Sequence, residues 1–495
     1  MDNSSKPVAS ALEGLSVDEL RRLGYRVIDM IVEHREELRD KPVHRQRSRK
    51  SLDDALPQSL PRQGTDPDTV LDLVATEILT AIAHTDHPRF FGYIPSPSNY
   101  ISVLADALVS GFNIFAGHWI AGSSAGAVEA TTLKWLAEIM GFPASAGGVF
   151  LSGGSMANLS AIHAARSALT GPSAGHDSQL TLYATGQAHS SISKACHILG
   201  FAPEQQRTIP AQPDQTMDCA ALEATLSEDV AAGRRPLLVA ATAGTTNTGA
   251  VDSLRRIREI CDRYQLWMHV DGAYGAAGRV CPELHETLDG IELADSLTLD
   301  PHKWWFQPFE IGCLLLRDGS LLRNAFTVQA EYLRESHAAA NTGPGDPTRT
   351  LEDEINFYEY GPQLTRSFRA LKLWMYLLTQ GVDRIGEMIL QGVNAAQEAE
   401  RLISQSPSFR VVTPASLGIV TFAPSDPKRS EKAPIQAAVK ALLADGHALI
   451  MTTELDDQTV FRFCPIHPDT TFEDMRGSLD RLATYLDTDR PADEA

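Results

Sequence analysis

The segment from Ser296 to Arg317 reads SLTLDPHKWWFQPFEIGCLLLR and places Lys303 between a histidine and two tryptophans. Lysine is among the residues least often buried without a partner, so a lysine in this aromatic setting needs a reason. Desolvation favours the neutral, nucleophilic amine, which can form a Schiff base with a carbonyl cofactor. The alternative is that the stem of Lys303 packs on Trp304 while the ammonium group reaches water. The rest of the chain must decide between the two.

Short apolar runs alternate with helical stretches between Gly147 and Leu316. The strand-like runs are GGVFLS, QLTLYAT, PLLVAATAG, LWMHVDGAY, DSLTLD and the run Ile311–Leu316. This alternation predicts an α/β fold with a mostly parallel sheet that helices cover on both faces. Ligands of such sheets bind beyond the carboxyl ends of the strands. The candidate residues at those ends are Gly153, Gly154, His189, Thr245, Thr246, Asp271 and Lys303.

The sequence SGGS, residues 152–155, joins a strand-like run to a helical one. Glycine and serine at the start of a helix present free backbone N–H groups to an anion, so Gly154 and Ser155 are candidate phosphate ligands. The same residues also form ordinary turns between a strand and a helix. The segment lacks the lysine of a P-loop and the GxGxxG spacing of a dinucleotide site, which disfavours a nucleotide.

Two further residues at strand ends suit a pyridine ring. Asp271 ends the run LWMHV beside small residues, where a carboxylate could keep a pyridine nitrogen protonated, and His189 in QAHSSISKA could stack on the ring. Taken alone, each fits a structural role, the aspartate in a solvated turn and the histidine in local packing. Together with the phosphate-binding turn and Lys303, they predict pyridoxal 5'-phosphate (PLP) as the cofactor.

The composition of the 495-residue chain disfavours several classes of partner. The net charge is −20, which argues against nucleic acid or an anionic membrane surface, and 43% hydrophobic residues with 21% charged residues are typical of a globular protein. The six cysteines are scattered, without a CxxC pair or His/Cys ligand spacing. The first residues lack the features of a signal peptide, and no apolar stretch approaches the roughly 20 residues that span a bilayer. We therefore expect a cytoplasmic protein without a metal site.

The N-terminal part of the chain shows helical periodicity. Residues 16–39 and 69–84 are expected to be helices joined by a basic, proline-punctuated connector, and residues 101–141 are expected to form two more. One amphipathic helix with such a connector cannot make a core alone. We expect its apolar face to lie on a second subunit of a homodimer, with packing on its own chain as the alternative.

The chain after Leu316 consists of a polar loop, a long helix and a smaller α/β region. The loop, residues 329–354, is rich in small and charged residues and is a candidate mobile lid. The stretch TRSFRALKLWMYLLTQG predicts the helix, and residues 385–495 alternate helix and strand. We expect an N-terminal helical segment (1–95), a large cofactor-binding domain (96–380) and a small C-terminal α/β domain (381–495).

The motifs HPRFFGYIP, AHSSISKA, AGTTNTGAVD, HVDGAY, DPHKWW and FRALKLW extend over nearly the whole chain. They resemble the group II PLP-dependent decarboxylases, closest to the aromatic-L-amino-acid decarboxylases. PHKW after HVDGA is highly specific for that family. The resemblance implies the type I aminotransferase fold, a small-molecule amino-acid substrate, and an interwoven homodimer with shared active sites and a swapped N-terminal segment.

The resemblance also implies a role for each matching residue. Lys303 would form the Schiff base, Asp271 would pair with the pyridine nitrogen, and His189 and Ala273 would lie against the two faces of the ring. The other matching positions are Gly154, Ser155 and His302 at the phosphate, Thr246 near the ring, and Arg462 in the C-terminal region. Lys303, His189 and His302 would take part in catalysis.

Tyr332, in the polar loop, matches the lid tyrosine of the family. The resemblance implies that it reaches the partner subunit's site and protonates the substrate carbon after carbon dioxide leaves, which gives an amine. In related aldehyde synthases this position is phenylalanine, and the reaction consumes oxygen. Tyr332 therefore favours plain decarboxylation.

Several positions depart from the family pattern. Asp300 replaces the usual asparagine before PHKW, which places a carboxylate near the phosphate, where His302 or a backbone donor would compensate for it. The hydroxyl of Thr365 favours phenolic substrates slightly, and Ile94 replaces an aromatic residue. The predicted substrate pocket consists of Tyr93, Pro95, Ser96 and Thr365, with Phe115 and His118 from the neighbouring subunit.

These residues favour decarboxylation of an L-amino acid with an aromatic side chain, such as tyrosine, DOPA, tryptophan or phenylalanine, to the amine and carbon dioxide. Two alternatives stay open because the pocket is rebuilt: an oxygen-consuming aldehyde synthase, and a decarboxylase of a non-aromatic amino acid. A non-catalytic relative kept as an interaction protein is disfavoured because Lys303, Asp271 and His189 are all present.

Overall fold

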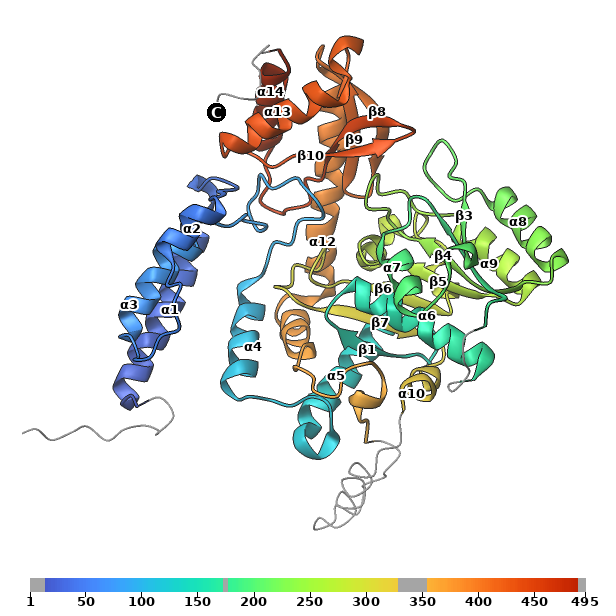
Figure 1. Ribbon diagram of the computed structural model, residues 1–495, viewed down its shortest axis with the longest axis horizontal. Coiled ribbons are helices and arrows are strands. Elements are labelled where there is room, and N and C mark those ends of the chain that lie inside the picture. The colour runs from blue at the N-terminus through green and yellow to red at the C-terminus, as the bar shows by residue number, and fades with distance from the viewer. Residues whose placement is uncertain (1–13, 172–176, 328–353, 488–495) are drawn as a thin grey trace, which may run out of the picture.

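The computed structural model describes residues 14–171, 177–327 and 354–487 (Figure 1). Tyr332 and all but the last residue of the predicted lid lie outside the described residues. The described chain consists of N-terminal helices, a central sheet with flanking helices, and a second sheet near the C-terminus. None of its helices is both long and apolar enough to cross a membrane.

The central sheet has seven strands in the order β1-β7-β6-β5-β4-β2-β3. The five strands from β6 to β3 are parallel, whereas β7 is antiparallel to both of its neighbours, β6 and β1. The mostly parallel sheet and its six predicted strands are confirmed, and only the short edge strand β3 was not predicted. The bounds are β1 (Gly147–Leu151), β2 (Leu180–Thr185), β3 (Gln206–Ile209), β4 (Arg235–Thr242), β5 (Trp267–Asp271), β6 (Ser296–Leu299) and β7 (Gly312–Leu316).

Helices cover both faces of this sheet. In β4, Leu238 and Ala240 join a buried cluster with residues of α6 and α7, whereas Val239 and Ala241 join the cluster that includes α8 and α9. Because successive side chains of a strand point to opposite faces, this alternation places the two pairs of helices on opposite sides. The bounds are α6 (Gly154–Thr170), α7 (Ser191–Ile198), α8 (Cys219–Ala231), α9 (Leu254–Tyr264) and α10 (Ser320–Phe326).

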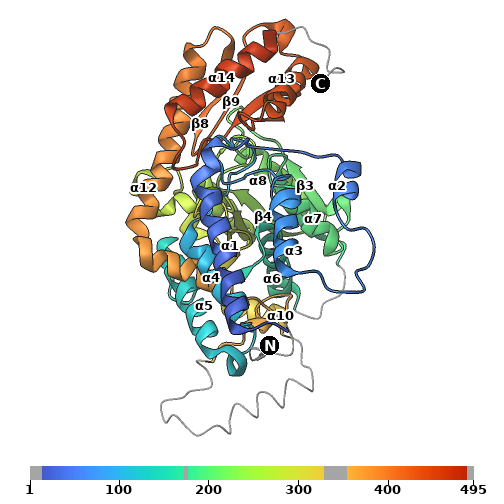
Figure 2. The same cartoon turned by 90° about the vertical axis from the view of Figure 1, so that its left-hand side faces the viewer.

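The N-terminal helices α1 (Val17–Glu37) and α3 (Pro67–Leu73) lie side by side, apart from the central sheet (Figures 1 and 2). Ser16 and Glu19 cap α1 reciprocally, and no residue of α1 is buried. Arg22 and Arg26 form ion pairs with Asp68 of α3. A short helix, α2 (Arg49–Ala55), lies between them in the sequence.

The helix predicted for residues 69–84 is shorter than expected. It begins at Pro67, continues as a π-helical turn over Val74–Ile78, and then ends. The prediction was wrong beyond Ile78 because Ala83 and His44 form an antiparallel bridge, and the His84 N–H donates to the Val43 carbonyl. The two helices predicted for residues 101–141 are confirmed as α4 (Tyr100–Gly111) and α5 (Trp119–Ile139).

The C-terminal unit is a four-stranded antiparallel sheet, in the order β10-β11-β9-β8, packed against helices. Its core includes Phe91 and four phenylalanines of the sheet, namely Phe409, Phe422, Phe461 and Phe463. The long predicted helix is α12 (Ala370–Gln405), which has a kink at Gly381 and runs across the expected boundary at residue 380. The other bounds are β8 (Phe409–Ser416), β9 (Ile419–Pro424), α13 (Lys432–Ala444), β10 (Met451–Leu455), β11 (Gln458–Phe463) and α14 (Phe472–Asp487).

A buried ion pair ties the segment before α12 to the central domain. The Arg366 guanidinium lies 2.6 Å from Glu129 Oε1, and the two side chains are 1% and 0% exposed. Arg366 also donates to the backbone carbonyls of Ala116 and Phe150, and Glu129 accepts the Phe150 N–H. Each charge is therefore surrounded by polar partners, and removal of one leaves the other buried without compensation.

We expect Glu129→Ala to lower the free energy of unfolding by about 3–5 kcal/mol, because it leaves the Arg366 guanidinium buried without its counter-charge. Urea unfolding followed by circular dichroism measures this. Glu387→Ala is the matched control, since it breaks an exposed pair with Arg384 and should cost less than about 1 kcal/mol. Equal effects of the two substitutions would contradict the argument that Glu129 compensates a buried charge on Arg366.

Candidate active site

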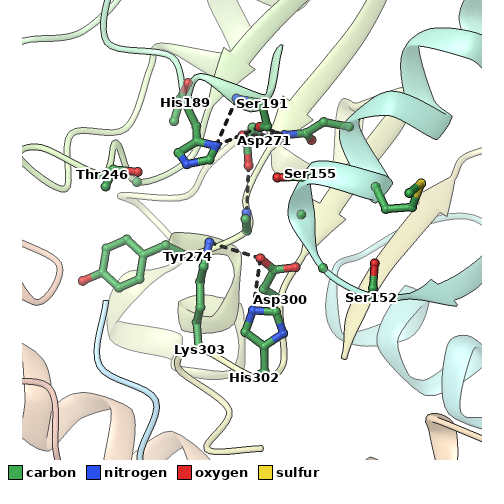
Figure 3. Close-up of a pocket in the computed structure, with 17 residues that line it drawn as sticks. Ser152, Ser155, His189, Ser191, Thr246, Asp271, Tyr274, Asp300, His302 and Lys303 are labelled. Carbon is green, nitrogen blue, oxygen red and sulfur yellow. Dashed lines mark hydrogen bonds and ion pairs between the residues drawn. The ribbon is translucent and has the colours of Figure 1, made fainter. Parts of the chain in front are cut away.

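A cavity of about 350 Å³ lies where β4, β5 and β6 end and where α6 and α7 begin. Its lining brings together ten of the residues predicted from the sequence, whereas the candidate Thr245 is not in the lining (Figure 3). The ten are Gly153, Gly154, Ser155, His189, Thr246, Asp271, Ala273, Asp300, His302 and Lys303. It also contains residues that were not predicted, among them Asn158, Ser191 and Tyr274. The parallel strands place these segments together because Thr242 pairs in register with Asp271, and Asp271 with Thr298.

Lys303 reaches into the cavity and pairs with Asp300. Its Nζ lies 3.1 Å from Asp300 Oδ2, and His302 Nε2 lies 3.7 Å from the same oxygen (Figure 3). The other carboxylate oxygen, Oδ1, is buried and has no hydrogen-bond partner among the described residues. Trp304, unlike Lys303, is not exposed to the cavity. Its side chain is fully buried and stacks on Tyr274. The side chain of Lys303 is about one quarter exposed, toward the cavity it lines.

The turn before α6 is confined by its neighbours. A Cβ atom at Gly154 would lie 2.8 Å from Asp300 Oδ2 and 3.2 Å from the Ala273 side chain, so this position needs glycine. No hydrogen bond within the described residues uses the backbone N–H of Gly154 or Ser155. These N–H groups stand at the N-terminus of a 17-residue helix, whose dipole attracts an anion.

The Asp271 carboxylate is held by two donors. Asn158 Nδ2 lies 2.8 Å from Asp271 Oδ2, and the Ala273 N–H lies 3.1 Å from Oδ1. Asn158 Nδ2 also donates to Ser191 Oγ at 2.8 Å, and Ser191 Oγ lies 2.8 Å from His189 Nδ1. The backbone N–H of Ser191 donates to the same imidazole nitrogen. His189 Nδ1 is therefore an acceptor, and the proton of the neutral ring is on Nε2.

The carbonyl of Asn158 faces the opposite way, into the sheet. Its Oδ1 accepts from Thr298 Oγ1 at 2.7 Å and lies 2.9 Å from His269 Nε2. The other nitrogen of His269 lies 2.8 Å from Ser296 Oγ, which accepts the Trp267 indole N–H. These contacts fix Asn158 with its oxygen toward His269 and its NH2 group toward Asp271.

The histidines of the site are neutral near pH 7. Burial lowers the pKa of His189 below its ordinary value, and the nearby Asp271 carboxylate only partly opposes this. Burial likewise lowers the pKa of His302, against the effect of Asp300. Burial also lowers the pKa of His269, which is fully enclosed. A neutral His269 can donate from Nε2 and accept at Nδ1, as the contacts of Asn158 and Ser296 require.

The predicted substrate residues lie outside the lining of this cavity. Ser96 donates its hydroxyl to the His302 carbonyl, and Tyr93 is 61% exposed. Arg462, which is buried, donates to the carbonyls of Tyr93 and Thr246 and so links the loop before α4 to the cavity rim. Pro95 is buried, Phe115 and His118 are partly buried, and Thr365 is exposed.

Sequence reasoning missed Asn158, Ser191, Thr298 and His269. Asn158 lies inside the helical run after SGGS, where an asparagine looks unremarkable. The available signal was its spacing, because residue 158 is four positions after Gly154 and shares that face of the helix. His269 precedes Asp271 by two residues on one strand, so both side chains point to the same face of the sheet.

The cavity fits PLP in size and in the kind of groups that it offers. The turn at Gly154 and Ser155 offers backbone N–H groups to a phosphate, and Asp271 offers a fixed carboxylate to a pyridine nitrogen. Ala273 and His189 are small or flat enough to lie against a ring, and Lys303 can bind an aldehyde. PLP is the one common cofactor that uses a phosphate, a pyridinium partner and a lysine amine together.

Comparison with known proteins agrees with this fit. The model of the family described as pyridoxal-dependent decarboxylase conserved domain matches residues 49–424. The chain is 39% identical to aromatic-L-amino-acid decarboxylase from Bacillus atrophaeus over 93% of its length and 94% of that protein. It is 32% identical to tryptophan decarboxylase 2 from Oryza sativa subsp. japonica, covering 83% of this chain and 82% of that one.

Solved structures show the same fold. The crystal structure of Oryza sativa TDC with PLP and tryptamine superposes with a TM-score of 0.87 at 28% identity, over 95% of this chain and 98% of that one. A match of this extent confirms the predicted fold class. By these matches the chain belongs to the pyridoxal-dependent decarboxylase family, whose cofactor is PLP and whose reaction is the decarboxylation of amino acids.

Proposed function

We propose that this enzyme decarboxylates L-amino acids with aromatic side chains, giving the amine and carbon dioxide. The similarity to an aromatic-L-amino-acid decarboxylase and to tryptophan and tyrosine decarboxylases supports this substrate class. In the reaction, a proton replaces the carboxylate group on the α carbon of the substrate. The protein must therefore hold the substrate, favour cleavage of the bond between the α carbon and the carboxylate, and deliver one proton.

The hydrogen bonds of Asn158 are the structural observation that supports the PLP chemistry of this proposal. When bound, PLP withdraws electrons from the substrate carbon, and it does so best with its ring nitrogen protonated. The Asp271 side chain, which Asn158 and Ala273 hold in place by hydrogen bonds, would pair with that nitrogen and keep its proton there. The same chain leaves His189 with a proton on Nε2, the nitrogen that Ser191 does not engage.

The other site residues have proposed roles that match their positions. Lys303 would hold the cofactor aldehyde, with Asp300 next to its amine to accept or share a proton. Gly154, Ser155 and His302 would surround the phosphate, and Thr246 would border the ring. Arg462 donates a hydrogen bond to the carbonyl of Thr246, which holds this part of the cavity lining in place.

We also propose that the active sites are shared in a homodimer. The apolar side chains of α1 are left uncovered by the described residues of this chain: Val17 is 54% exposed, Tyr25 65% and Val27 38%. A second subunit is the proposed cover for that face. In such a dimer Phe115, His118 and Tyr332 would belong to the partner's site. This accounts for Phe115 and His118, which do not line the cavity of their own chain.

An aldehyde synthase is the second candidate. Phenylacetaldehyde synthase from Arabidopsis thaliana is 32% identical to this chain over 87% of both proteins, so the fold supports both outcomes. That reaction converts the amino acid, oxygen and water into an aldehyde, carbon dioxide, ammonia and hydrogen peroxide. The residue at position 332 separates the candidates, since a phenol can give a proton to the substrate carbon and a phenyl ring cannot.

We expect the wild-type enzyme with PLP to convert tyrosine, DOPA, tryptophan or phenylalanine to the amine without peroxide. Tyr332→Phe should move the products toward aldehyde and peroxide, because the proton donor is lost while the cofactor site is intact. Mass spectrometry of the products with a peroxide assay in air measures both. Lys303→Ala is the control without turnover. Aldehyde and peroxide from the wild type would favour the second candidate, and no turnover of any aromatic amino acid would refute the proposed substrate class.

We expect Asn158→Asp to weaken PLP binding by at least about tenfold, or roughly 1.4 kcal/mol, at mildly alkaline pH. The new carboxylate would repel Asp271 in place of the hydrogen bond that Asn158 gives it. Titration of apoenzyme with PLP, followed by absorbance, measures this. The affinity should recover toward acidic pH, where one proton shared by the two carboxylates restores a donor.

The control for this change is Asn394→Asp, which adds the same charge at an exposed position of α12. It should bind PLP as the wild type does. The melting temperature of each apoenzyme separates a local effect from unfolding. Wild-type PLP affinity in Asn158→Asp across the whole pH range would contradict the proposed role of Asn158 in positioning Asp271.

A further inference from the structure

Two histidines and an aspartate come together near the end of α1, and none of the three lines the candidate active-site cavity. His34 lies in the last turn of α1, and His84 and Asp86 lie after the π-helical turn, about fifty residues later. One potential ligand atom from each of the three side chains lies within 4.8 Å of the others. The imidazole rings of His34 and His84 are 5.1 Å apart between centroids.

We infer that His34, His84 and Asp86 bind a divalent transition-metal ion, with Zn²⁺ as the best match. Two imidazole nitrogens and a carboxylate oxygen are ligands that zinc prefers, and three protein ligands with a water in the fourth position form a common zinc geometry. The inference concerns a second site and does not depend on the proposed reaction.

The distance between His34 and Asp86 supports a shared ion. His34 Nε2 and Asp86 Oδ2 are 3.4 Å apart. A direct hydrogen bond between nitrogen and a carboxylate is usually about 2.7–2.9 Å. Two ligand atoms about 2.0–2.1 Å from a tetrahedral zinc ion are about 3.4 Å from each other. The spacing is therefore long for a direct bond and suitable for two ligands of one ion.

His84 gives a second, independent observation. Its side chain is 8% exposed, yet neither ring nitrogen makes a hydrogen bond within the described residues, and Nδ1 is completely buried. A buried polar atom without a partner is rare in proteins. A metal ion would satisfy the ring once the three ligand atoms, now within 4.8 Å of one another, close to the separation of about 3.4 Å that tetrahedral zinc requires.

The proposed ion would join the end of α1 to a segment that contacts the C-terminal unit. The His84 N–H bonds to Val43, and the Val43 N–H bonds to Gly446. A few residues later, Phe90 pairs with Leu449, and the Tyr93 carbonyl that follows accepts a hydrogen bond from Arg462. Zinc would thus fix the base of the N-terminal helices against the body of the subunit.

The test uses tag-free enzyme that has been loaded with PLP, freed of excess PLP, stripped with a chelator and dialysed. Titration with Zn²⁺ by calorimetry should give one site per chain, and elemental analysis after dialysis should give the same ratio. His34→Ala and Asp86→Asn should weaken zinc binding at least tenfold. His44→Ala, which removes a neighbouring histidine outside the cluster, should bind zinc as the wild type does. Zinc should also raise the melting temperature of the wild type but not of His34→Ala.

Two results would overturn the inference. If the wild type binds no zinc, the cluster is only an ion pair between His34 and Asp86. If zinc binds equally well to His34→Ala and Asp86→Asn, the ion occupies another site. His34 and Asp86 have side chains that are 30% and 22% exposed, so their variants should fold even if His84→Ala does not.

Discussion

The hydrogen bond from Asn158 to Asp271 is the contact on which the arrangement of the active site depends. It joins α6, which begins at the predicted phosphate-binding turn, to β5, which carries Asp271. A single amide side chain meets four groups, because its NH2 binds Asp271 and Ser191 and its oxygen binds Thr298 and His269. These hydrogen bonds fix which atoms donate and which accept. They therefore place the ring proton on Nε2 in both His189 and His269. Fully satisfied networks of this kind make one arrangement of a buried site much more stable than any other.

The antiparallel strand β7 helps to fix the position of Lys303. The segment between β6 and β7 must reverse direction within twelve residues, and it does so with Asp300, His302 and Lys303 in the turn. Both flanking strands are completely buried. The turn is thus anchored at both ends by the core, which explains how a partly exposed lysine can be held at one place in a cavity.

The central sheet and most of the cavity could be predicted from the sequence because both follow from local signals. Buried parallel strands are continuous apolar runs, and the residues that end them meet at one edge. Asp271 and Lys303 were therefore found from their positions at strand ends together with their immediate neighbours, small residues for Asp271 and aromatic residues for Lys303. Asn158 could not be found this way, since its importance comes from partners on β5, β6 and α7 that are distant in sequence. The end of α3 was missed for a similar reason, because a bridge to His44 competes with the helix. The short strands β3 and β10 carry too few apolar residues to stand out.

The contacts of Arg462 can form only late in the synthesis of the chain. It lies on β11, yet it bonds to the carbonyl of Thr246, 216 residues earlier, and to that of Tyr93, 369 residues earlier. Domains usually fold as units while the chain emerges from the ribosome. The central sheet can form as soon as β7 has emerged, but the rim of the cavity lacks this arginine until β11 follows. The edge of the cavity that Arg462 holds can therefore be completed only after β11 has been synthesised, later than every strand of the central sheet.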